Sequence, residues 1–193
     1  MEQNKCDACG KVFDSKEQLM EHARMHKGNA KYSPRVSRVI ISSIIGGVFG
    51  GILMLLVLMT GASAMGLPDT IFALVMGMGL GASMSSGVAV GVLAHFTVSI
   101  VAGAIFGAIV SYVKPIRLRS GPVSLVLGLV FGIVVYLVFF LPMAETVFAS
   151  VMMKLMGVKA AMMLPDVLVV GFIGHIVYGL TLGTTAFYLG RKI

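Results

Sequence analysis

Residues 91–107 have the sequence GVLAHFTVSIVAGAIFG, which places glycine, histidine or serine at every fourth position of an uncharged stretch. No charged residue occurs between Asp69 and Lys114. A helix needs about 20 consecutive apolar residues to cross a bilayer, and small residues four apart let two helix backbones approach closely in lipid. The stretch therefore predicts a membrane-spanning helix near residues 86–113, with its small residues on a face that packs against another helix.

Three further uncharged stretches have the same character, and the mean hydropathy of the whole chain is +0.98. Two shorter apolar pieces are too short to cross a bilayer, so we expect them to lie in its outer interface or to re-enter it. The predicted fold class is an all-α integral membrane protein. Its four transmembrane helices lie near 38–60, 86–113, 121–142 and 167–190, and its short outer helices near 69–82 and 145–157.

The positions of the basic residues favour four spans over six. They gather at three places in the chain: Lys31, Arg35 and Arg38; Lys114, Arg117 and Arg119; and Arg191 with Lys192. Four spans put all three groups on one side, which the positive-inside rule identifies as the cytoplasm, whereas six would put the middle group outside. We therefore expect a multi-pass protein of the cell membrane with both termini cytoplasmic. The net charge of +7 then reflects orientation and does not require nucleic-acid binding.

The membrane-embedded part contains an internal repeat. The pattern of residues 91–107 recurs in residues 171–183, GFIGHIVYGLTLG, and this alignment pairs His95 with His175. The same GxxxG spacing in both segments is a common device for helix packing in lipid. The match suggests that the second and fourth spans are equivalent.

Other segments align in the same order along the chain. The aligned pairs are Gly46 and Gly50 with Gly128 and Gly132, and residues 69–76 with 145–152. We interpret residues 38–113 and 121–193 as two tandem two-span repeats, joined by the basic cytoplasmic loop 114–120. An even number of spans per unit gives both units the same orientation, related by an axis along the membrane normal.

The first 27 residues contain a set of metal-ligand side chains. Cys6, Cys9, His22 and His26 follow the spacing C-x2-C-x12-H-x3-H. Two thiolates and two imidazoles close a tetrahedral structural zinc site, and histidines four residues apart leave the same face of a helix. Zinc-binding thiolates must be reduced, which agrees with a cytoplasmic N-terminus. The spacing therefore predicts a zinc ion held by these four residues.

This segment resembles the C2H2 zinc-finger family, because Phe13 and Leu19 also occupy that family's two core positions. The resemblance covers residues 6–26 and implies a ββα zinc finger over residues 1–27, followed by a basic linker over 28–37. The base-reading positions of the family fall on Ser15, Glu17, Gln18 and Glu21. Acidic side chains there would face phosphates, so we expect a protein contact or a structural role in preference to nucleic acid.

His95 and His175 are the candidate cofactor-binding residues of the membrane domain. Each lies on the face of its span that has the small residues, so we expect both to point into the bundle. Three interpretations remain open. They are neutral histidines bonded across helices, a pair that ligates haem or a metal, and a pair on a proton or solute pathway.

Methionine is abundant in the outer segments. Eight of the 15 methionines lie there: Met76, Met78, Met84, Met152, Met153, Met156, Met162 and Met163. Thioethers bind Cu(I), so a copper entry site is one interpretation. Flexible packing of apolar segments is the other, and it is favoured because methionine commonly fills irregular gaps.

The sequence has no motif for catalysis, such as a Walker loop, G-x-S-x-G or H-E-x-x-H, and no acidic residue within the four spans. We therefore expect no enzymatic activity. The preferred function is an interaction or accessory subunit of an oligomer or larger complex. Its bundle would pack with membrane proteins in the lipid bilayer, and its finger would contact a cytosolic protein. The alternative is a small transporter or a haem- or metal-holding subunit that uses His95 and His175. A membrane-tethered nucleic-acid binder is a weaker one.

Overall fold

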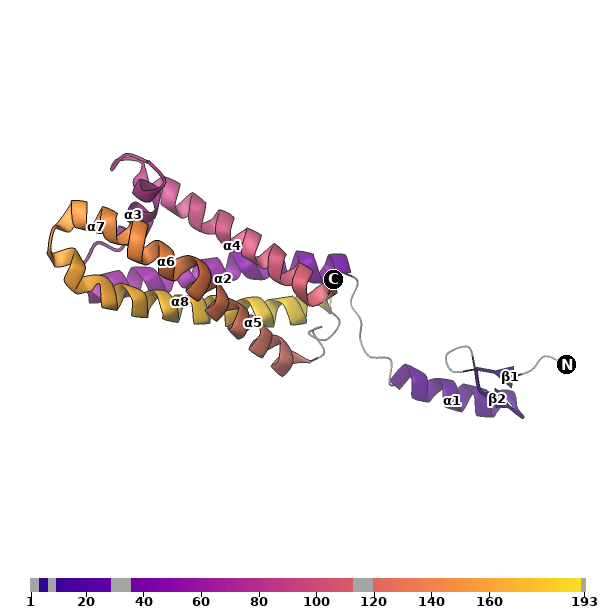
Figure 1. The fold of residues 1–193 in the computed structure, drawn as a ribbon. Coiled ribbons are helices and arrows are strands. Elements are labelled where there is room, and N and C mark those ends of the chain that lie inside the picture. The colour runs from indigo at the N-terminus through magenta and orange to yellow at the C-terminus, as the bar shows by residue number, and fades with distance from the viewer. Residues whose placement is uncertain (1–3, 7–9, 29–35, 113–119, 192–193) are drawn as a thin grey trace. The chain divides into compact units, whose positions relative to one another are not determined.

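The chain divides into two compact units, Met1–Ser33 and Pro34–Ile193. The computed structural model describes residues 4–6, 10–28, 36–112 and 120–191. The long apolar helices all belong to the C-terminal unit (Figure 1).

The N-terminal unit consists of a two-stranded antiparallel sheet and one helix. Strand β1 (Asn4–Lys5) pairs with β2 (Val12–Phe13), and helix α1 (Lys16–Gly28) follows. Gly10 adopts a φ of +77° in the turn between the strands, a conformation that costs glycine little. Ser15 caps α1, because its Oγ accepts a backbone N–H of the first turn at 3.2 Å.

The identification of this unit as a C2H2 zinc finger is wrong. A structural zinc site needs four ligands around one point. The described residues contain no group of three or more His, Cys, Asp or Glu side chains that could hold a metal ion. Among them, Cys6 is buried and the ring of His22 packs on Phe13 with centroids 4.6 Å apart. Cys9 lies outside the described residues, as does the side chain of His26.

Four helices of the C-terminal unit are long and apolar enough to cross a membrane, as the uncharged stretches predicted. They are α2 (Val36–Ala64), α4 (Gly87–Tyr112), the continuous helix Gly121–Met156 and α8 (Lys159–Gly190). Their most apolar windows have mean hydropathies of 1.9 to 2.8. The protein is therefore a helical, multi-pass membrane protein by length and composition.

The third span and the second short piece form one helix, whereas the sequence predicted a separate outer helix over 145–157. Its segments are α5 (Gly121–Val135), η2 (Tyr136–Phe140), α6 (Leu141–Met143), η3 (Ala144–Phe148) and α7 (Ala149–Met156), where η2 and η3 are π-helical turns. Pro142 lacks an N–H and its ring crowds the carbonyl one turn earlier, so the backbone widens around it without ending the helix. Gly157, with a φ of +62°, then ends α7.

The first short piece is a separate helix, α3 (Ile71–Gly79), as predicted. It lies along α4, and glycine makes this close approach possible. A methyl group added at Gly91 of α4 would collide with the backbone carbonyl of Ala73 in α3. At this position the two elements are therefore joined by direct backbone contact.

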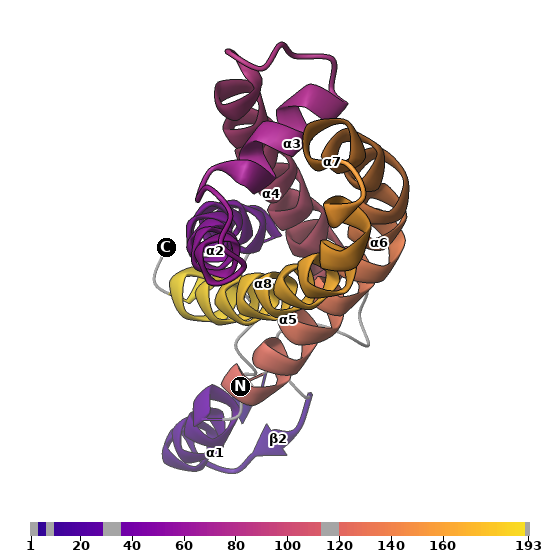
Figure 2. The same cartoon turned by 90° about the vertical axis from the view of Figure 1, so that its left-hand side faces the viewer.

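The four long helices pack in the order α4, α2, α8, α5. The starts of α2 and α5 and the ends of α4 and α8 lie at one end of the bundle, and α3 and α7 lie at the other (Figure 1). In the view turned by 90°, the helix from α5 to α7 runs obliquely past α8 towards α3 (Figure 2). This oblique course brings η3 and α7 to α3, on the far side of the bundle from the start of α5.

Glycines hold two of these helix pairs together. The contacts are Gly47 with Ser99 and Gly103 in the α2–α4 pair, and Gly128 with Gly179 and Gly183 in the α5–α8 pair. The predicted stripes of small residues are therefore helix contacts. One detail of the alignment is wrong: Gly47, and not Gly46, contacts its partner as Gly128 does, while Gly46 faces α8.

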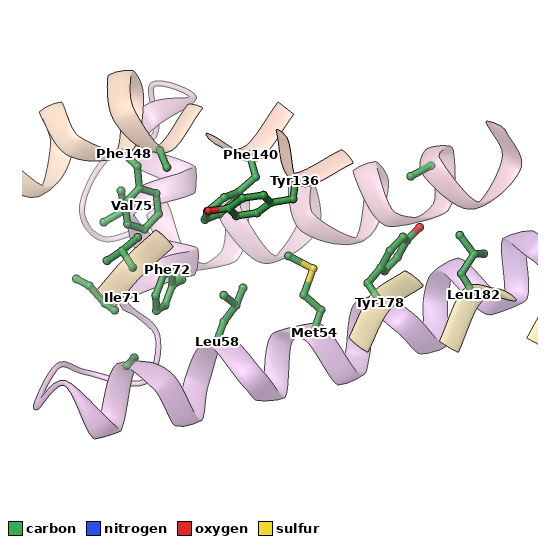
Figure 3. Close-up of a cluster of buried hydrophobic side chains, with 14 of the residues drawn as sticks. Met54, Leu58, Ile71, Phe72, Val75, Tyr136, Phe140, Phe148, Tyr178 and Leu182 are labelled. Atoms are coloured by element: carbon green, nitrogen blue, oxygen red, sulfur yellow. The ribbon is translucent and has the colours of Figure 1, made fainter. Parts of the chain in front are cut away.

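Large apolar side chains fill the interior between the helices. Met54 and Leu58 of α2, Phe72 of α3 and Tyr178 of α8 all belong to one buried cluster (Figure 3). Phe140 of η2 joins the same cluster from the opposite side. Because these side chains come from four different elements, they fix the position of η2 relative to α8.

Candidate ligand cavity

An apolar cavity lies where α4 and α5 face each other. Its volume is about 720 Å³. Among the described elements, α4 and α5 do not pack extensively against each other, so a space lined by side chains remains between them. The walls come from α2, α3, α4, α8 and the helix from α5 to η3, and they consist mainly of valine, methionine, leucine and phenylalanine.

Aromatic contacts lie towards both ends of the cavity. The rings of Phe72 and Phe148, from α3 and η3, are 5.5 Å apart between centroids. Towards the other end, the rings of Phe106 and Phe131 join α4 to α5 at 5.3 Å. The remaining side, between α4 and α5, is lined by exposed apolar residues: Val98, Val101, Ile105, Val134 and Phe139. The cavity therefore opens sideways, on a surface suited to lipid.

His175 lies in the part of the wall that α8 contributes, and only 5% of its surface is exposed. Its Nδ1–H donates to the carbonyl of Gly171, one turn earlier, at 2.7 Å. The rings of Tyr136 and Phe140 pack beside it, with centroid distances of 5.5 and 5.1 Å. Since a carbonyl only accepts, the uncharged ring is protonated at Nδ1, and Nε2 presents a lone pair.

His95 lies on α4, in another part of the same wall. Its Nε2–H donates across the helix pair to the carbonyl of Gly51 at 3.0 Å. The two histidines that the sequence alignment paired thus line one cavity, but their hydrogen bonds differ. His95 bonds to a neighbouring helix, whereas His175 bonds within its own.

Two tyrosines that sequence reasoning did not single out also line or border the cavity. The hydroxyl of Tyr178 donates to the carbonyl of Ser99 at 2.7 Å and joins α8 to α4. The hydroxyl of Tyr136 donates to the carbonyl of Leu168 at 3.1 Å and joins η2 to α8. Tyr178 lies three residues after His175 on the same helical face, which is the spacing that could have identified it.

Comparison with known sequences assigns the membrane domain to a family. The sequence model of a family of unknown function, DUF6789, matches residues 37–192, which cover the four long helices apart from Val36. The chain belongs to this family. No curated protein and no solved structure matches the chain. The DUF6789 region begins with α2, so it lends no support to a zinc finger in the N-terminal unit.

The cavity of the DUF6789 region suits some cofactors better than others. Its polar side chains are His95, Thr97, Ser99, His175 and Tyr178. A haem carries two carboxylates, which favour cationic partners, and the described lining contains no lysine or arginine. The lining therefore fits an uncharged molecule better than haem.

The methionines considered for copper are dispersed through the domain. Met76 lines the cavity, whereas Met152 and Met163 are buried in the hydrophobic core. Met84 and Met162 are exposed. This distribution is typical of packing residues and does not gather the thioethers at one point.

Proposed function

We propose that this protein is a membrane accessory subunit that holds an uncharged, apolar ligand drawn from the bilayer. The cavity between α4 and α5 is the observation that supports the proposal. Its volume of about 720 Å³ falls within the range of roughly 300–1,000 Å³ typical of pockets for small organic ligands. Such pockets are mainly apolar with a few polar groups that orient the ligand, and this lining has that character.

The shape of the cavity favours a compact ligand over a partner helix. A transmembrane helix needs a groove about 30 Å long to pack against. Here the Phe72–Phe148 and Phe106–Phe131 contacts lie across the two ends. The side opening between Val101 and Val134 supports direct entry from lipid, because both residues are about half exposed.

This proposal retains the interaction role expected from the sequence and joins it to the alternative that the two histidines serve a bound molecule. The subunit would present its ligand to other membrane proteins and would not transform it. Catalysis is not part of the proposal, since the N–H and O–H donors of these side chains are engaged in hydrogen bonds to backbone carbonyls.

The tandem repeat is part of the same proposal. Gly47 and Gly51 of α2 contact α4 as Gly128 and Gly132 of α5 contact α8, so these glycines correspond. Each pair is 81 positions apart. Their partners Ser99 and Gly103 correspond to Gly179 and Gly183, 80 positions later. The matching glycine contacts in the α2–α4 and α5–α8 pairs support the proposal that they are two copies of one helix pair with the same orientation.

We further propose that the end of the bundle where α2 begins and α8 ends faces the cytoplasm, because the basic residues flank these helix ends in the sequence. Single cysteines in a Cys6→Ser, Cys9→Ser background test this orientation. A membrane-impermeant maleimide applied to intact cells should label Ser85→Cys, between α3 and α4, and should label Ser120→Cys, at the start of α5, only after lysis. The opposite labelling pattern would reverse the orientation.

Ligand binding is testable with a photoactivatable hydrocarbon, a diazirine-bearing tetradecane, in nanodiscs of defined lipid. Crosslinks should map to Val98, Val101 and Val134, which line the opening. The substitution Val134→Trp fills the cavity and should lower crosslinking to the α4 residues at least about fivefold.

The matched control is Val130→Trp, one turn earlier on the same helix. Val130 is 51% exposed and Val134 is 47% exposed, but only Val134 is among the residues that line the cavity. Crosslinks spread evenly over all lipid-facing residues, or equal effects of the two tryptophans, would contradict ligand binding in the cavity.

A further inference from the structure

We infer that the ligand is an apolar alcohol or phenol whose hydroxyl donates a hydrogen bond to Nε2 of His175. The inference rests on the proposed function, because it specifies the ligand class for the same cavity. Four observations lead to it: the hydrogen-bonding state of the polar lining, the accessibility of Nε2, the depth of His175, and the absence of cations from the described lining.

The polar hydrogens of the described lining side chains already take part in hydrogen bonds. The hydroxyls of Thr97 and Ser99 donate to backbone carbonyls of α4, each at 2.8 Å. The hydroxyl of Tyr178 and one N–H of each uncharged histidine donate to carbonyls as well. The described residues that line the cavity therefore offer a ligand hydrogen-bond acceptors and no unused donor. A ligand with only a ketone or ester group would find no partner, whereas a hydroxyl would.

Nε2 of His175 is the acceptor best placed for such a hydroxyl. The ring's hydrogen bond among the described residues is the one from Nδ1 to Gly171. Among the described residues, Ser43 Oγ is the only fully buried side-chain N or O atom without a hydrogen bond. Nε2 of His175 has no such bond among them either, so the atom itself is not fully buried, although the residue as a whole is. Nε2 is therefore reachable, and the space next to this ring is the cavity.

The depth of His175 excludes large polar head groups. At 1.5 Å per residue it lies roughly 24 Å from the Lys159 end of α8 and roughly 22 Å from the Gly190 end. A phosphate or sugar at that depth would lose its hydration, and the described lining has no lysine or arginine to compensate. A single hydroxyl on an isoprenoid, sterol-like or phenolic body costs far less to bury and recovers a hydrogen bond.

The test compares two probes that differ by one hydrogen-bond donor, farnesol and farnesyl methyl ether, as competitors of the diazirine-bearing tetradecane in nanodiscs. Farnesol should displace the crosslinker at a mole fraction about two- to tenfold lower than the ether, the range that one hydrogen bond gives. In His175→Phe the preference should disappear, so that farnesol and its methyl ether displace the crosslinker at equal mole fractions.

The outcomes separate this inference from the proposed function. If both probes displace the crosslinker equally in the wild-type protein, the hydroxyl inference is wrong and apolar binding stands. If neither displaces it from the lining residues, the proposed function fails as well. His95→Phe serves as the second variant. Loss of the preference there, with retention in His175→Phe, would overturn the assignment to His175.

Discussion

The two halves of the membrane domain share a helix seam and differ at their outer ends. In the first half α2 and α4 meet through Gly47, and in the second α5 and α8 meet through Gly128. The first half then forms a separate helix, α3, whereas the second continues without interruption from α5 into α7. The shared seam supports the fold, and the parts that differ shape the cavity.

The difference is clearest at one pair of aligned glycines. Gly91 in α4 lies beneath the backbone of Ala73, so α3 sits directly on the helix. At the aligned position, Gly171 in α8 lies beneath the ring of Phe140. A side chain has replaced a backbone contact, and that side chain also packs on His175. The two halves therefore differ in what covers the equivalent glycine: a backbone segment in the first half and an aromatic ring in the second.

The largest effect is expected at the shared seam. Gly47→Leu and Gly128→Leu should each cost about 3 kcal/mol or more, because the new side chain meets backbone atoms that cannot move independently. The loss should appear as a lower thermal midpoint in detergent, by about 6 °C or more, or as loss of the monodisperse peak. Gly121→Leu, where an added Cβ meets nothing closer than 3.5 Å, is the control. If Gly47→Leu left the thermal midpoint unchanged while Gly128→Leu lowered it, the two halves would not be equivalent.

A smaller, asymmetric effect is expected where the halves differ. Gly91→Ala should lower the thermal midpoint by about 2–12 °C, since it forces α3 away from α4. Gly171→Ala should also destabilise the protein, but Phe140→Leu should restore most of the loss, because the obstacle there is a side-chain ring. No second substitution at Ala73 should rescue Gly91→Ala, because the obstacle is backbone. If a substitution at Ala73 restored the stability of Gly91→Ala as fully as Phe140→Leu restores that of Gly171→Ala, the two glycines would be covered in the same way.

The smallest effect concerns a pair of serines 81 positions apart. Ser43 Oγ is buried and has no hydrogen-bond partner among the described residues, whereas Ser124 Oγ donates to the carbonyl of Ser120 at 2.9 Å. Removing an unpaired buried hydroxyl relieves about 1 kcal/mol, so Ser43→Ala should raise the thermal midpoint by about 2–4 °C. Ser124→Ala should leave it unchanged or slightly lower. A fall with Ser43→Ala would indicate that the hydroxyl has a partner in the membrane.

The sequence predicted the parts of the fold that depend on hydropathy and on glycine spacing. The four spans and the separate α3 are confirmed, because uncharged apolar runs and close-packing residues have few alternative uses in a bilayer. The continuous helix from α5 to α7 was not predicted. We expected the third span to end near residue 142 and a separate helix to begin near residue 145, but π-helical turns accommodate Pro142 within one helix, and only the three-dimensional packing selects them.

The candidate site was partly within reach of the sequence. The spacing of His95 and His175 predicted that both face the bundle interior, and both line the cavity. Their hydrogen bonds were beyond prediction, since they depend on which carbonyl lies nearest. The identification of a C2H2 zinc finger was wrong: the described residues contain no group of side chains that could hold a metal ion, and ligand spacing along a chain does not by itself establish such a group.

The sideways opening between α4 and α5 has a consequence for how the protein would respond to its surroundings. A molecule that enters there comes from a two-dimensional solvent, and its supply is its mole fraction among the lipids. Apolar molecules are strongly enriched in that phase, so weak intrinsic contacts are enough for high occupancy. Occupancy would then follow the composition of the membrane, and a cell could change it by altering its lipids without altering the amount of protein.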